Sequence, residues 1–170
     1  MHMVKLPSVL LCLLLVTAAC GDGDSTADAP ELLFVQHSDG AVLNDSTLTL
    51  SGVSPQTGWF TDRPYREAGQ ISTAEFVSLW AEGEDSFTEN PPNADFTCTV
   101  DGEIVNYVVE LTSPRLDGDE LTYGALAIGA TASPGAAASC TNAHLFIDGA
   151  RGWECREGKC RNDEMIPYRG

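Results

Sequence analysis

Alternation of apolar and polar residues is the feature that most limits what this chain can fold into. Leu48 and Leu50 face one way, and the Thr and Ser residues between them face the other. The pattern recurs over 96–100 and 105–111. A period of two is that of a strand with one buried face. Asp101-Gly102 lies between the two later segments and predicts a tight hairpin, so these segments are expected to pair antiparallel.

Further strands are bounded by turn residues. The apolar run ELLFVQH at 31–37 precedes Asp39-Gly40, which predicts a strand followed by a turn. Asp117-Gly118 predicts a second hairpin, leading into a strand at 121–128. Two more segments complete the C-terminal half, a long loop at 129–139 and a last strand at 143–148.

One short helix is predicted among these strands. Ser72 and Glu75 form a capping box, in which the Ser hydroxyl accepts a hydrogen bond from the Glu75 amide. Phe76 and Trp80 then lie on one apolar stripe, and Gly83 ends the helix after about three turns. A helix this short is marginal alone, so its stripe must dock on a sheet. The sequence therefore predicts a mainly β fold, a small antiparallel sheet or sandwich with one short inserted α-helix.

The N-terminal segment predicts export and a lipid anchor. Residues 1–19 carry one lysine followed by an apolar core, which is the form of a signal peptide. Thr17-Ala18-Ala19-Cys20 then fits a lipobox, in which Cys20 becomes the lipid-modified first residue. Residues 20–30 are small and acidic, as in a solvated linker. The remainder, 31–170, is expected to be a single disulfide-bonded, β-rich domain.

Ordinary signal-peptide cleavage is the alternative, because Thr17 and Ala19 also satisfy the small-residue rule of that cleavage. Cysteine parity favours lipidation. Of the six cysteines, Cys12 lies in the signal and Cys20 at the junction, which leaves four that can pair completely. A free Cys20 would leave an odd thiol in an oxidising compartment. We therefore expect an exported lipoprotein of a bacterial outer membrane, at its periplasmic face or on the cell surface.

The four remaining cysteines are expected to form two disulfides. Cys155 and Cys160 are close enough to clip a terminal loop, and Cys98 then pairs with Cys140. The alternative is a zinc site with the ligands Cys140, His144, Cys155 and Cys160. Its spacing fits no zinc pattern and would leave Cys98 unpaired. We expect disulfides, with no metal and no cofactor.

The acidic balance excludes some partners. The chain has 9 Lys and Arg against 25 Asp and Glu, a formal net charge of −16. Binding to nucleic acid or to an anionic membrane surface would be repulsive, so the lipid anchor is the expected membrane contact. The charge is uneven, because only Arg63, Arg66 and Arg115 are basic between residues 20 and 150.

The candidate binding residues lie in one turn-rich segment: Trp59, Asp62, Arg63, Tyr65 and Arg66. Two arginines beside aromatic faces can clamp a carboxylate or phosphate, so an envelope component or a small anionic ligand is the expected partner. The alternative is that the arginines pair with local acids such as Asp62 and Glu67 and fix the loop on the domain.

Motifs for catalysis are missing from the sequence. It has no G-x-S-x-G, no H-E-x-x-H and no glycine-rich phosphate loop. We expect a non-catalytic binding or structural module on a membrane surface. The competing hypothesis is an envelope hydrolase acting on a cell-surface polymer, in which His37 or His144 would meet an acid and a hydroxyl in one pocket.

The segment 52–94 also carries a resemblance. It holds a GVSP turn, the aromatic pair Trp59-Phe60, a DRP-x-R segment, AG, a short helix ending in W-x-x-G, then DSF and PPNA. This order resembles a family of uncharacterised exported proteins and covers roughly a quarter of the chain. The resemblance implies a shared fold. Members often carry His where this chain has Gln70, so any chemistry of that His would be lost here.

Lipidation at Cys20 is directly testable. We expect Cys20→Ser to abolish the acyl modification and to release the protein from membranes, while Cys12→Ser leaves both unchanged. Mass spectrometry of the mature N-terminal peptide, with membrane fractionation, measures both effects. An intact, acyl-free Cys20 in the wild-type protein would contradict the prediction.

Overall fold

The computed structural model describes residues 31–83, 86–128, 138–149, 153–156 and 159–162. The predicted signal peptide at 1–19 and the linker with Cys20 lie outside these ranges. The described elements are one helix, α1 (Thr73–Leu79), and ten strands: β1 (Leu32–Leu43), β2 (Thr47–Val53), β3 (Gln56–Thr61), β4 (Ala68–Ser72), β5 (Asn93–Val100), β6 (Glu103–Asp117), β7 (Glu120–Ala127), β8 (Ala138–Ile147), β9 (Trp153–Arg156) and β10 (Lys159–Asn162). The predicted mainly β fold with one short helix is confirmed.

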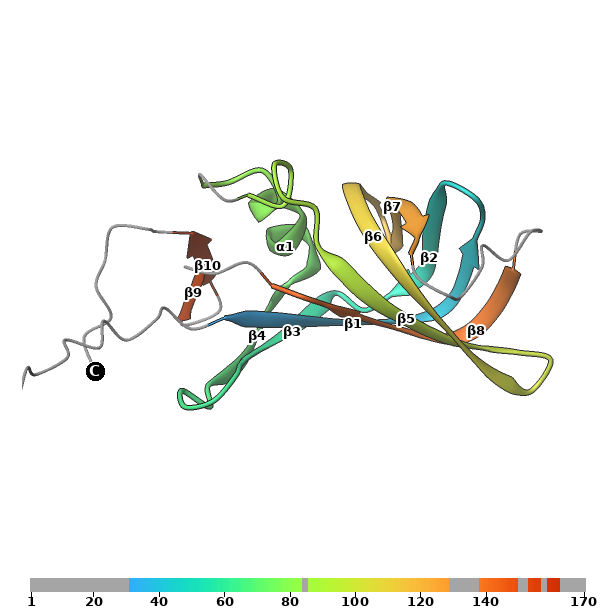
Figure 1. Ribbon diagram of the computed structural model, residues 1–170, viewed down its shortest axis with the longest axis horizontal. Coiled ribbons are helices and arrows are strands. Elements are labelled where there is room, and N and C mark those ends of the chain that lie inside the picture. The colour runs from blue at the N-terminus through green and yellow to red at the C-terminus, as the bar shows by residue number, and fades with distance from the viewer. Residues whose placement is uncertain (1–30, 84–85, 129–137, 150–152, 157–158, 163–170) are drawn as a thin grey trace, which may run out of the picture.

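The main sheet closes on itself. Its strand order is β2-β7-β6-β5-β8-β1-β3-β4, and β2 also pairs with β1, so β1, β2, β7, β6, β5 and β8 form a closed ring, the barrel. Every pairing is antiparallel. In Figure 1, β2, β6 and β7 curl over β1, β5 and β8. Closure removes the two free edges that an open six-stranded sheet would expose.

Strand β1 is shared between the barrel and an extension. Its first residues pair with β3, from Leu32↔Thr61 to Val35↔Gly58, and its last residues pair with β2, from Ser38↔Val53 to Leu43↔Leu48. Its other edge pairs with β8 along nearly the whole length. The sheet therefore splits at one edge of β1, and β3 and β4 continue it outside the barrel (Figure 1).

The turn predicted at Asp39-Gly40 is wrong, because β1 continues through these residues. Pairing with both β8 and β2 holds the backbone extended there. The alternation of buried and exposed side chains changes phase there, because Ser38 and Ala41 are both buried although they are three residues apart. A Cβ on Gly40 would lie 3.0 Å from Ser51 Oγ, so the glycine permits close approach of β2. The local turn preference of Asp39-Gly40 is therefore overridden by strand pairing on both edges of β1.

Other strands bend where residues adopt positive φ. Gly52 (φ 63°) lies in β2, Ser113 (φ 47°) in β6 and Asn142 (φ 50°) in β8. Register shifts accompany the bends in the β6–β7 and β5–β8 pairs. A Cβ on Gly52 would lie 2.6 Å from Asp39 Oδ2, so both backbone conformation and space require glycine there. Such irregularities raise the local twist and let a small sheet curl into a ring.

The two predicted hairpins are confirmed. Asp101 and Gly102 have φ values of 51° and 86° and join β5 to β6, as a two-residue turn with positive φ requires. Gly118 (φ 63°) begins the turn between β6 and β7. Most of the loop expected at 129–139 lies outside the described residues, and 138–139 belong to β8.

Helix α1 begins as predicted and ends early. The Ser72 hydroxyl accepts from the Glu75 amide at 3.1 Å, which is the predicted cap. The helix ends at Leu79, because the amides of Trp80 and Glu82 bond to carbonyls three residues back. This tighter turn replaces the third helical turn expected up to Gly83. The helix contacts β3, β4, β6 and β10.

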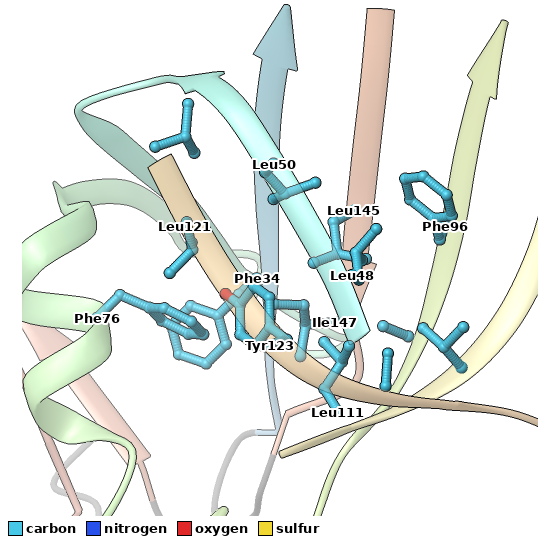
Figure 2. Close-up of a cluster of buried hydrophobic side chains, with 14 of the residues drawn as sticks. Phe34, Leu48, Leu50, Phe76, Phe96, Leu111, Leu121, Tyr123, Leu145 and Ile147 are labelled. Atoms are coloured by element: carbon cyan, nitrogen blue, oxygen red, sulfur yellow. The ribbon is translucent and has the colours of Figure 1, made fainter. Parts of the chain in front are cut away.

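An aromatic cluster joins α1 to the barrel interior. Phe76 of α1 lies 4.9 Å from Phe34 of β1, and Trp80 lies 5.6 Å from Tyr123 of β7, between ring centroids. Phe87 contacts both Phe34 and Trp80. Figure 2 shows Phe76 pointing from the helix toward Phe34 and Tyr123, among leucines from several strands. The predicted stripe therefore docks on the sheet and covers one end of the barrel.

The cysteines lie in the two pairs that the sequence predicts. Cys98 of β5 is bonded to Cys140 of β8, with 5.8 Å between Cα atoms, and Cys155 of β9 to Cys160 of β10. The longer closure spans 42 positions and stabilises by about 4 kcal/mol in the chain-entropy model. All four sulfurs are used, so the alternative zinc site does not form.

Truncation of Phe34 tests the aromatic cluster. Its side chain is fully buried, so Phe34→Ala should lower the free energy of unfolding by about 3–5 kcal/mol. The control is Ile104→Ala, because Ile104 is 78% exposed and should change stability by less than about 0.5 kcal/mol. Urea unfolding with the disulfides intact measures both. Equal effects would show that the cluster does not stabilise the fold.

Candidate functional site

Four of the five predicted binding residues lie on the loop between β3 and β4. Asp62, Arg63 and Arg66 are exposed there, and Tyr65 is half-buried. The loop is short and well bonded: the amide of Thr61 donates to the carbonyl of Glu67 at 2.9 Å, and the amide of Glu67 donates to the Thr61 hydroxyl at 2.8 Å. The two arginines are thus presented on a defined hairpin.

Trp59 is separated from this group. It lies inward on β3 with 7% of its surface exposed, and its indole lies against Gly69 of β4. A Cβ on Gly69 would lie 2.6 Å from the ring. Its Nε1 donor has no partner among the described residues. Trp59 therefore packs the β3–β4 hairpin and does not share a surface with the arginines.

The arginines do not make the predicted local ion pairs. Within the described ranges, no carboxylate lies within ion-pair distance of the Arg63 or Arg66 guanidinium. The Arg66 amide donates to the Asp62 carbonyl at 3.2 Å, which is a backbone bond only. Both guanidinium groups are therefore available to an external anion, in a chain that otherwise has few basic residues.

Half-buried Phe60 and exposed Phe146 form an aromatic pair that the sequence analysis missed. Phe60 lies on the opposite side of β3 from Trp59, and its ring centroid is 5.6 Å from that of Phe146 on β8. Phe146 is 38% exposed. We call this pair the aromatic face. Phe60 lies two residues before Asp62, where β3 leads into the arginine loop. The alternation in both strands indicated outward positions, but their contact depends on register across β1.

The surroundings of His37 and His144 give no support to the hydrolase alternative. His144 faces His37 across the β1–β8 pair and Thr97 across the β5–β8 pair. The Thr97 hydroxyl, however, donates to the Asp95 carboxylate at 3.4 Å and accepts from Asn106 Nδ2 at 3.0 Å. A hydroxyl bound in this way is not activated by a histidine, so no acid, histidine and nucleophile assemble here.

A chain of buried hydrogen bonds crosses the interior. The Tyr123 hydroxyl donates to Gln36 Oε1 at 2.7 Å, and Gln36 Nε2 lies 3.2 Å from the Thr57 hydroxyl. Thr57 and Thr73 are joined at 3.1 Å, and the Thr73 hydroxyl donates to the Ser54 carbonyl at 2.7 Å. The last group, the Ser54 carbonyl, can only accept, so each hydrogen bond is donated in the direction from Tyr123 toward Ser54. The hydroxyls of Thr57 and Thr73 each accept one bond and donate one, and the Tyr123 hydroxyl only donates.

This buried chain is structural. Burial raises the pKa of Tyr123 well above its ordinary value, against a smaller lowering by the bond to Gln36, so the phenol keeps its proton. The residues come from β7, β1, β3 and the first turn of α1. Their bonds fix the helix start against the barrel, because a buried polar group without a partner costs free energy.

Two hollows in the described part of the chain are small and open to solvent. One of about 220 Å³ is lined by the link before β5 and by two acids: Glu31, Phe87, Asn90, Pro91, Pro92, Asn93, Asp148 and Gly149. The other, of about 190 Å³, lies along the start of β2 and the middle of β6 and β7: Asp45, Ser46, Glu110, Thr112, Gly124, Ala125 and Leu126. Neither contains a predicted site residue.

The described residues contain neither a metal-ligand cluster nor a membrane-spanning helix. No group of three or more His, Cys, Asp or Glu side chains converges as a metal site there. No helix in the described part of the chain has the length and apolar character needed to cross a membrane.

Comparisons of the chain with protein-family models, with curated proteins and with solved structures find no match. The resemblance of 52–94 to an exported family therefore stays a prediction.

Replacing Tyr123 with Phe tests the buried chain. The change keeps the ring and leaves Gln36 Oε1 without its donor, so the free energy of unfolding should fall by about 1–3 kcal/mol at neutral pH. Tyr107→Phe is the control, since Tyr107 is half-buried and stacks on Phe96. That control should change stability by less than about 0.5 kcal/mol in the same urea titration.

Tyr123→Phe should also reduce the loss of folding stability at alkaline pH. The folded-state pKa of Tyr123 is raised above 10.0, so its contribution to stability is complete below that pH. Above it, the unfolded chain releases the proton first, and stability falls as the pH rises. Between about pH 8 and pH 10.5, wild type should lose about 0.8 kcal/mol more than Tyr123→Phe. Equal losses would show that Tyr123 is not buried as a phenol.

Proposed function

We propose that this chain is an exported, lipid-anchored envelope protein that acts as a non-catalytic binding module. Cys20 is the proposed anchor, and residues 20–30 the proposed linker. The observation that carries the binding role is the surface of the β3–β4 hairpin, where Arg63 and Arg66 are exposed without a described carboxylate partner beside the aromatic face. The proposed ligand is an anionic component of the cell envelope.

The packed interior favours a ligand on the outside. Leu48, Leu111 and Leu121 point into the barrel and are fully buried, and α1 covers one end with aromatic rings (Figure 2). Small-molecule pockets usually enclose several hundred Å³ and an apolar lining. The two hollows described above are smaller than this, so a surface site suits the described part of the fold better than either hollow.

The chemistry of the surface suits a polymer of acidic sugars. A guanidinium binds a carboxylate through parallel hydrogen bonds, and a flat aromatic ring offers apolar area to a sugar ring. Arg63 and Arg66 supply the first contact, and Phe60 and Phe146 the second. Between residues 20 and 150 the only other basic residue is Arg115, so an anionic chain would be repelled by most of the acidic surface there and would favour this hairpin.

Affinity electrophoresis in gels containing polygalacturonate tests the proposal, with neutral dextran as the control polymer. We expect polygalacturonate to retard the protein and dextran to leave its mobility unchanged. Arg63→Ala, Arg66→Ala and Phe146→Ala should each weaken binding about tenfold, which corresponds to about 1.4 kcal/mol. Arg115→Ala is the matched control, because Arg115 is an exposed arginine of β6, outside the hairpin.

Binding should also weaken as salt increases, because the arginine contacts are exposed. An equal effect of Arg115→Ala would indicate attraction to charge in general. No retardation of the wild-type protein would rule out acidic sugars as the ligand class.

A further inference from the structure

We propose that His37 and His144 form a surface site for one divalent transition-metal ion of the copper and zinc class. The two residues are direct cross-strand partners in the antiparallel β1–β8 pair. Their ring centroids lie 4.7 Å apart, and the ring planes are inclined by 35°. This site is independent of the proposed sugar-binding role.

The ring separation matches that of two imidazoles on one metal ion. With metal–nitrogen bonds of about 2.0–2.1 Å, a bound ion lies about 3.2 Å from each ring centroid. For neighbouring ligands at about 90° to 110°, the two centroids are then about 4.5–5.2 Å apart. The observed 4.7 Å falls inside this range, so the spacing of the two rings is compatible with one shared ion.

Both imidazoles are accessible. His37 and His144 are exposed, and no hydrogen bond or ion pair of either ring is found among the described residues. Their neighbours on the outward side are Thr97 of β5 and Phe146 of β8, and neither carries a positive charge. Metal binding would therefore displace only water from the rings, on a protein whose net charge of −16 attracts cations.

The backbone beneath the pair is rigidly held. Strand β8 is bonded on both edges, by β1 and β5, and β1 is bonded to β8 on one edge and to β2 and β3 on the other. Ligands on paired strands keep their spacing better than ligands on loops. The Cys98–Cys140 disulfide further joins β8 to β5, close in sequence to His144.

The donor set points to a particular kind of ion. Imidazole nitrogen suits Cu²⁺, Ni²⁺ and Zn²⁺, and for a given site Cu²⁺ binds most tightly in the series. No third His, Cys, Asp or Glu joins the pair in the described structure. Two protein ligands leave the other coordination positions to water or to an external ligand, so the site should bind reversibly.

Copper titration of the full chain tests this site. The chain has three histidines, so every sample should carry His2→Ala, together with Cys12→Ser and Cys20→Ser to remove the thiols outside the two disulfides. The protein is kept in detergent, and Cu²⁺ alone is the probe. Calorimetry counts bound ions, and electron paramagnetic resonance reports nitrogen ligands.

We expect one Cu²⁺ equivalent with a two-imidazole spectrum that is lost in His37→Ala and equally lost in His144→Ala. Val42→Ala, at an exposed position of β1 that belongs to neither proposed site, should retain it. The thermal midpoints of the two histidine variants should match the parent, since both side chains are exposed. The proposal would be overturned if either histidine variant still bound one Cu²⁺ per chain, or if the spectrum of the parent showed a single imidazole.

Discussion

The fold depends on one strand that pairs along both of its edges. β1 is bonded to β8 on one side and is divided between β3 and β2 on the other. The absence of a side chain at Gly40 permits close approach of β2 to the second half of β1, while the first half pairs with β3 and continues into the β3–β4 extension (Figure 1). Without the β1–β2 pairing the sheet would remain open, with two unpaired edges.

Closure leaves the surfaces that we propose for binding on the outside of the barrel. Six strands enclose only enough space for their own side chains, and Phe34, Tyr123 and the helix residue Phe76 fill the covered end. The polar chain through Gln36 is satisfied internally and serves packing. The outward residues of β1, β3 and β8, with the hairpin beyond β3, carry the proposed ligand and metal sites.

Much of the fold was predictable from local chemistry. The cap at Ser72, the positive φ turn at Asp101-Gly102 and the alternation around Leu48 are each decided within a few residues. Strand β4 and the β9–β10 hairpin were missed, because their short segments carry weak patterns. Asp39-Gly40 misled, since pairing on both sides overrode a local turn preference.

The sequence by itself determined the cap of α1, the hairpin turns after β5 and β6, and which cysteines can pair. These follow from backbone geometry and neighbouring residues. Only the tertiary structure decided that the sheet closes, that Trp59 is buried while Arg63 and Arg66 are not, and that His37 meets His144. Those outcomes depend on register between strands far apart in the chain, which packing of the whole core fixes.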